Sequence, residues 1–209
     1  MEAIWHALLE GAPFSFINMF VAAFAVAIIA ERAFHVLTRY KVNAEEFMNQ
    51  VAKLVQAGNI DRAVKLSQAA NMPLLQIVRA GLTQVNRGED AIMASIEERM
   101  SEVLPKLEKR IAWLWSLANI ATLIGLLGTI KGLIVAFNAV GAIKDPAEKT
   151  NKLMAGIGEA MWNTAFGLGI AVSCMIAHLF LHSMAKKHKE ELERAAMRLE
   201  NLLTIRRQG

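Results

Sequence analysis

The sequence predicts an all-α membrane protein with three transmembrane helices, the second and third of them long and extended into the cytoplasm as a helical domain. Two observations lead to this fold class. The chain is 55% hydrophobic with a mean hydropathy of +0.33, although its 209 residues include 23 Lys and Arg and 19 Asp and Glu. Its apolar and charged residues also fall into separate blocks, whereas a soluble domain of this length mixes them around one core.

Three apolar runs are long enough to cross a bilayer, which takes about 20 helical residues. We assign them to residues 14–37, 111–142 and 153–185. Both of the later runs exceed the length that one bilayer requires, so their helices are expected to tilt or to project beyond the membrane. The short polar stretch 143–152 contains the turn signal Asp145-Pro146 and makes these two helices an antiparallel hairpin.

Lys and Arg residues are distributed unevenly between the spans. Residues 1–13 contain none, the hairpin loop 143–152 contains three, residues 38–110 contain eleven and residues 186–209 contain seven. The positive-inside rule then places the N-terminal segment and the hairpin loop outside, and the other two segments in the cytoplasm. The first span is expected to stay in the mature protein, because no basic residue precedes it as in a cleaved signal peptide.

The two predicted cytoplasmic segments show a helical period and no strand period. Asn43 followed by Glu46 is a capping arrangement at the start of a helix. The helix that precedes the second span is expected to run directly into it, with a bend at Pro105. In the C-terminal segment one helix face is apolar, and it consists of Leu192, Ala195, Leu199 and Leu202.

No pattern in the chain predicts an enzyme, a cofactor or nucleic-acid binding. The glycines of GLLGTIKG lack the preceding strand, and the lysine lacks the following Ser or Thr, of a phosphate-binding loop. Basic residues alternate with acidic ones and have no aromatic stacking surface beside them. His178 and His182 lie four residues apart and could share a metal, but they lie where the third span meets the cytoplasm, which favours interface histidines and no metal site.

Small residues recur at steps of three or four within the last two spans. Such ridges let transmembrane helices approach closely, with or without a role in transport. The residues that we assign to helix packing are Gly125, Gly128, Gly132, Ala165 and Gly169.

Three threonines lie within the same spans. Thr122 and Thr129 are seven residues apart and share a helix face, and Thr164 lies at comparable depth on the returning helix. Each hydroxyl either bonds a carbonyl of its own helix or lines a polar pathway, and the spacing leaves both alternatives open.

Two charged residues lie within the apolar runs, Lys131 in the second and Glu159 in the third. A charge at the bilayer centre costs about 3 kcal/mol, so each is expected to face protein, water or a partner. The two side chains are close enough in predicted depth to form an ion pair. The alternative is that Lys131 reaches outward along its stem and Glu159 lies in the outer interface.

The segments GLLGTIKGLIVAF at 125–137 and GIGEAMWNTAFGLGIAV at 156–172 resemble the two signature segments of ExbB and TolQ, and more distantly those of MotA. In this resemblance Thr129 and Thr164 take the positions of the pore threonines, and Glu159 that of the family glutamate. Thr122 departs from the family, which often has proline there, and Lys131 replaces a residue that is usually uncharged.

The resemblance implies a pore-forming stator subunit of a bacterial inner-membrane motor, driven by the proton or sodium motive force. It also implies a homopentamer around a dimer of a single-span partner similar to ExbD or TolR, which brings the ion-binding membrane aspartate. Apart from Glu159, no carboxylate of this chain lies deep in a span, which agrees with a partner that supplies one. The alternatives are a secondary transporter, for which no inverted repeat is visible, and a passive membrane scaffold.

Overall fold

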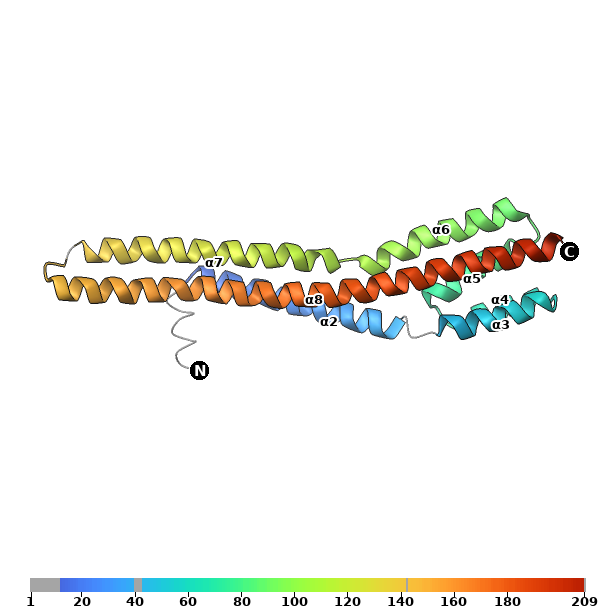
Figure 1. Ribbon diagram of the computed structural model, residues 1–209, viewed down its shortest axis with the longest axis horizontal. Helices are drawn as coiled ribbons and strands as arrows, with labels where there is room; N and C mark the ends of the chain where they lie inside the picture. Colours follow the sequence, from blue (N-terminus) through green and yellow to red (C-terminus); the bar gives the residue numbers. More distant parts are fainter. Residues whose placement is uncertain (1–11, 40–42, 142, 209) are drawn as a thin grey trace. The chain divides into compact units, whose positions relative to one another are not determined.

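This computed structural model describes residues 12–39, 43–141 and 143–208. In that part of the chain the regular secondary structure is entirely helical. The helices are α2 (Phe14–Arg39), α3 (Ala44–Gln56), α4 (Ile60–Ser67), α5 (Pro73–Thr83), α6 (Glu89–Glu108), α7 (Ile111–Val140) and α8 (Pro146–Gln208). Two compact units are formed. One contains α2 up to Glu31 together with Arg110–Phe180, and the other contains Arg32–Lys109 together with α8 from Leu181 onward. Helix α8 thus contributes to both units (Figure 1).

Three helical stretches are long and apolar enough to cross a membrane. They are Phe14–Val36, a stretch within Glu89–Val140 and a stretch within Pro146–Thr204. The predicted all-α fold with three long apolar helices is therefore confirmed, as is the greater length of the second and third.

The hairpin between α7 and α8 is tighter than the range 143–152 in which the sequence analysis placed its loop. Helix α8 begins at Pro146, a residue whose fixed φ suits the first helical position. The Asp145 carboxylate caps this start, since it accepts hydrogen bonds at 3.3 Å from the backbone N–H groups of Ala147 and Glu148.

The prediction that the helix before the second span runs directly into it is wrong. Pro105 lies inside α6, and the helix ends one turn later, at Glu108. The backbone then leaves the helix at Lys109 (ψ 131°) and at Arg110, whose φ of 65° is left-handed. The Arg110 guanidinium lies 2.5 Å from the Glu31 carboxylate of α2, so this left-handed residue forms an ion pair with a helix far away in the sequence.

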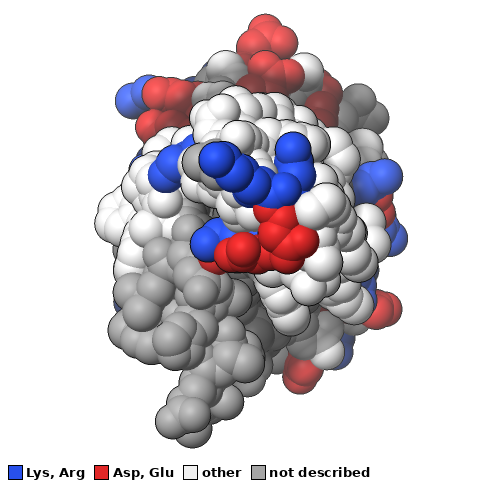
Figure 2. Space-filling view, turned by 90° about the vertical axis from the view of Figure 1, so that its left-hand side faces the viewer, with Lys and Arg blue, Asp and Glu red and all other residues white. Residues whose placement is uncertain are grey.

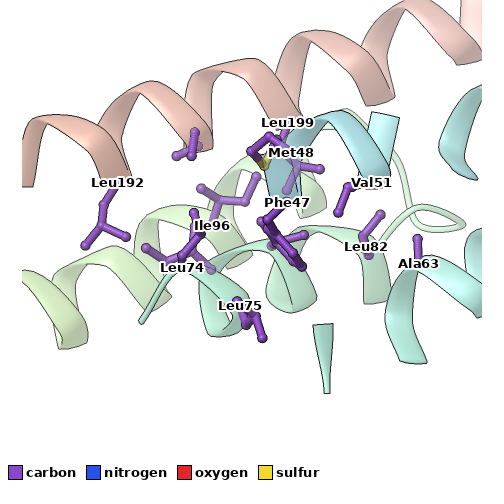
Figure 3. Packing of buried hydrophobic residues seen from close by; sticks show 14 of the residues in the cluster. Phe47, Met48, Val51, Ala63, Leu74, Leu75, Leu82, Ile96, Leu192 and Leu199 are labelled. Atoms are coloured by element: carbon purple, nitrogen blue, oxygen red, sulfur yellow. The ribbon is translucent and has the colours of Figure 1, made fainter. Parts of the chain in front are cut away.

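The second unit is built around an apolar core from α3, α4, α5, α6 and the C-terminal part of α8 (Figure 3). Asn43 caps α3 as predicted, because its Oδ1 accepts from the N–H of Glu46 at 3.3 Å. The predicted apolar face of the C-terminal helix is confirmed. Leu192, Ala195 and Leu199 are buried in this core, and Leu202 packs against it.

Candidate functional site

The hydroxyl groups of Thr129 on α7 and Thr164 on α8 contact each other where the two helices of the first unit cross. Thr129 Oγ1 also lies 3.2 Å from the carbonyl oxygens of Gly125 and Ala160, and Thr164 Oγ1 lies 3.2 Å from the same Gly125 oxygen. Both side chains are half-buried. The sequence placed the two threonines at similar depth, and the structure brings them together as one polar pair across the helix–helix interface.

Thr122 is not part of this pair. Its hydroxyl donates to the Ala118 carbonyl of its own helix at 3.0 Å, which is the local bond that a mid-helix threonine commonly makes. In this chain Thr122 therefore contributes a satisfied polar group two turns away from Thr129.

Glycines on α7 allow the two helices to approach at the threonine pair. A Cβ atom on Gly125 would lie 2.9 Å from the Asn163 carbonyl oxygen, and one on Gly128 would lie 2.9 Å from Asn163 Cβ. A Cβ on Gly132 would lie 2.7 Å from Ala160 Cβ. No larger residue fits at these positions without separating the helices.

On α8 the close contact is made by a glycine that the sequence analysis did not select. A Cβ on Gly167 would lie 2.6 Å from the Ala121 carbonyl oxygen, whereas one on Gly169 would meet nothing within 4 Å. Ala165 and Gly169 are both exposed in the single chain. Asn163 and Gly167 are four residues apart, a spacing that could have indicated this helix contact. Ala165 and Gly169 have the same spacing on another face of α8, so spacing alone does not distinguish the two faces.

Two further polar residues lie at this crossing that the sequence did not lead us to predict as site residues. Ser15 of α2 donates a buried hydrogen bond of 2.7 Å to Oδ1 of Asn163. Asn18, one helical turn after Ser15, is 1% exposed, and its Oδ1 finds no donor within the described part of the chain. The signal for both residues was their polar side chains within an apolar run, and the Ser15 bond attaches α2 to the helix that carries Thr164.

The predicted ion pair between Lys131 and Glu159 does not form. The Lys131 ammonium instead donates to the Ala12 carbonyl oxygen at 2.8 Å and lies 5.9 Å from the centre of the Phe14 ring. Lys131 and Glu159 nevertheless line the same cavity of about 400 Å³.

These contacts also define the level of Lys131 along the first span. Lys131 lies beside the start of α2, and Arg110 pairs with Glu31 near the other end of the apolar run. The 21 residue steps from 110 to 131 correspond to about 31 Å of helix, close to the roughly 30 Å of a hydrocarbon core. The geometry supports the alternative in which Lys131 reaches an interface.

His178 and His182, the two residues that could share a metal, both lie on α8. The His178 ring lies 6.0 Å from the Trp115 ring, centroid to centroid. No group of three His, Cys, Asp or Glu side chains suited to a metal ion occurs over residues 12–39, 43–141 and 143–208.

Large apolar side chains cover the outside of the three spans. Such exposure is incompatible with water and typical of a surface that lipid or other subunits cover. Among those exposed by more than half are Phe20, Phe34, Leu123, Ile134, Phe137, Met161, Trp162, Val172, Leu179 and Phe180.

Comparison with known proteins finds a matching protein family and several relatives. The family model described as MotA/TolQ/ExbB proton channel family matches residues 69–194. An ExbB-like biopolymer transport protein of Synechocystis sp. is 27% identical over 152 residues, which cover 73% of this chain and 72% of that protein.

Two Tol-Pal system proteins TolQ also match. That of Haemophilus influenzae is 33% identical over 87 residues, or 41% of this chain and 37% of the relative. That of Pseudomonas aeruginosa is 28% identical over 114 residues, or 49% of this chain and 48% of the relative. The matched part thus spans less than half the length of either TolQ protein. The family match covers more than half of this chain and includes both glycine-rich segments around Thr129 and Thr164, so the chain belongs to the MotA/TolQ/ExbB proton channel family.

Proposed function

We propose that this chain is the pore-forming stator subunit of an inner-membrane motor. The subunit uses the proton or sodium motive force to drive mechanical work through a single-span partner similar to ExbD or TolR. The observation that carries this proposal is the pair of threonine hydroxyls at a glycine-lined helix crossing, within the range that matches a proton channel family. A hydroxyl can both donate to a carboxylate and accept from water, so it eases ion exchange without a fixed charge.

The ion-binding carboxylate comes from the partner. Within 111–142 and 153–185 the one acidic residue is Glu159, and it lies beside the cavity of Lys131, on the hairpin side of Thr164. A relay across the bilayer needs titratable groups at several depths. Each charge that crosses yields about 2.3 kcal/mol per 100 mV, which is several times the thermal energy and sufficient to drive a mechanical step.

Exposed small residues on α8 support assembly into a homopentamer. Ala165, Gly169 and Ser173 form a ridge whose Cα atoms are open to a neighbour in the single chain. Membrane helices associate through such ridges because backbones can then approach closely.

We expect native mass spectrometry in mild detergent to show five copies of this chain, with two copies of a co-expressed single-span partner. Proteoliposomes of the complex should take up protons or sodium ions under an imposed potential, and the pentamer without partner should not. A stable monomer would contradict the stator assignment, and flux without any partner would favour a transporter instead.

The proposed orientation has the N-terminal segment and the α7–α8 hairpin outside. Single cysteines at Glu2→Cys and Lys149→Cys, in a background with Cys174→Ser, should react with a membrane-impermeant thiol reagent in intact cells, because both segments lie on the side with few Lys and Arg. A cysteine at Asp61→Cys should react only after permeabilisation. The opposite labelling pattern would invert the proposed topology.

A further inference from the structure

Three neutral polar side chains are buried where α2 packs against α8 in the first unit. Ser15 and Asn18 of α2 are 3% and 1% exposed, and Asn163 of α8 is 7% exposed. At the hairpin end, which faces the viewer in Figure 2, basic and acidic side chains gather instead. Polar groups are costly to bury in an apolar span, and where they are hydrogen-bonded they favour one arrangement of the helices.

The Asn163 side chain contacts both of the other spans. Its Oδ1 accepts a hydrogen bond of 2.7 Å from Ser15 Oγ of α2. The same side chain lies against Gly128 of α7, where an added Cβ would come within 2.9 Å of Asn163 Cβ and 3.2 Å of its Nδ2. One amide therefore links α2, α7 and α8 at a single level of the first unit.

Asn163 directly precedes Thr164, so rotation of α8 about its own axis moves both side chains together. Thr164 Oγ1 contacts the Thr129 hydroxyl and lies 3.2 Å from the Gly125 carbonyl oxygen. With about 5 Å from the helix axis to the side-chain ends, a rotation of about 10° moves this hydroxyl by about 1 Å. Such a shift takes a contact of 3.2 Å beyond hydrogen-bond range. The threonine contact therefore requires a closely defined rotation of α8.

Asn18 makes a second contact with α8, one helical turn after Ser15. A Cβ on Gly167 would lie 3.2 Å from Asn18 Nδ2, and Gly167 follows Asn163 by one turn. Helices α2 and α8 thus run in the same direction and meet through polar side chains at two successive levels. The other buried side chains of α2 in this unit are apolar, and apolar contacts have no direction. The polar contacts therefore define the register between the two helices.

We propose that Asn163 is a positioning residue for the pair formed by Thr129 and Thr164. The bond from Ser15 and the contact with Gly128 together set the rotation of α8 at which the two hydroxyls meet. Helix α2 contributes neither threonine but thereby takes part in shaping the ion pathway, a role that rests on the proposed function. The Ser15 hydroxyl and the Asn163 amide are uncharged, so they hold this geometry without a fixed charge beside the pathway.

The rotation is measured by the rate of disulfide formation between Thr129→Cys and Thr164→Cys after addition of an oxidant to the full-length protein with Cys174→Ser. Cysteines in place of two touching hydroxyls can reach each other. Ser15→Ala and Asn163→Leu should each slow this cross-link about fivefold or more, and the double variant should be no slower than the slower single variant, since both changes remove the same bond.

The matched control is Ser15→Thr, which keeps the donor and has room for its methyl group in the groove that Ser15 lines. It should cross-link at the rate of the parent cysteine pair. A Ser15→Thr variant as slow as Ser15→Ala would overturn the proposal, because the hydroxyl would then not be the cause. So would an unchanged cross-linking rate together with a lower melting temperature in Ser15→Ala, since the bond would then only attach α2.

Ion flux is measured separately, in the complex with both threonines intact. Ser15→Ala should lower it about fivefold without a change in subunit number, as expected for two residues that act through one bond. Slower cross-linking with full flux would overturn the role of α2 in the pathway. A wild-type complex without flux would refute the proposed function, whereas the cross-linking rates would still decide whether Asn163 positions the threonines.

Discussion

Thr129→Val and Thr164→Val are each expected to leave assembly intact and to reduce ion flux at least tenfold. Valine keeps the shape of threonine and the hydrophobicity of the span but removes the hydroxyl. Loss of either hydroxyl removes the contact between the two side chains. Loss of the Thr129 hydroxyl also removes its hydrogen bonds to the Gly125 and Ala160 carbonyls. Loss of a buried hydrogen bond costs about 1 kcal/mol, and up to about 3 kcal/mol where an aspartate of the partner is left unpaired.

The flux is measured in proteoliposomes of the complex under an imposed potential, and assembly by native mass spectrometry. Thr150→Val is the matched control, because Thr150 lies in the first turns of α8 and its hydroxyl donates to the Pro146 carbonyl of its own helix. It should leave the flux unchanged. Valine variants at both Thr129 and Thr164 that assemble and conduct normally would make the threonines packing residues.

Gly167→Ala is expected to lower the melting temperature of the subunit by several degrees, whereas Gly169→Ala does not. The added Cβ at residue 167 would lie 2.6 Å from the Ala121 carbonyl and 3.1 Å from Gly125 Cα. Both neighbours are backbone atoms and cannot turn aside, so the helices must separate. Overpacking of this kind costs about 1–3 kcal/mol, and here it also disturbs the adjacent threonine pair.

The two glycine variants form a matched pair. Each gains about 1 kcal/mol of helix propensity from glycine to alanine, so the difference between them isolates the helix crossing. Melting is followed by circular dichroism in mild detergent. Equal behaviour of the two variants would mean that α7 and α8 do not cross at Gly167.

The three spans, the helical character of the remaining segments and the family could all be predicted from the chain alone. Hydropathy adds up along consecutive residues, and a run such as 111–142 exceeds a bilayer thickness whatever it packs against. The signature segments around Thr129 and Thr164 are likewise contiguous, so their resemblance to the family needs no tertiary information.

The helix faces that meet could not be predicted in the same way. Ridges through Gly167 and Gly169 have similar spacing, and the difference lies in the rotation of α8 against α7. The Ser15–Asn163 bond joins residues 148 positions apart, and the Lys131 partner is a carbonyl 119 positions away. The break at Arg110 likewise coincides with an ion pair to Glu31 of another helix, a contact that no pattern in the sequence predicts.

Periodicity places a residue on a face of its own helix, but the rotation and axial register of that face come from contacts with other helices. The apolar runs therefore specified how many times this chain crosses the membrane. Packing between α2, α7 and α8 specified that Asn163, Gly167 and the two threonines share one crossing. The same packing directs Lys131 to Ala12 instead of Glu159, because its stem lies beside the start of α2.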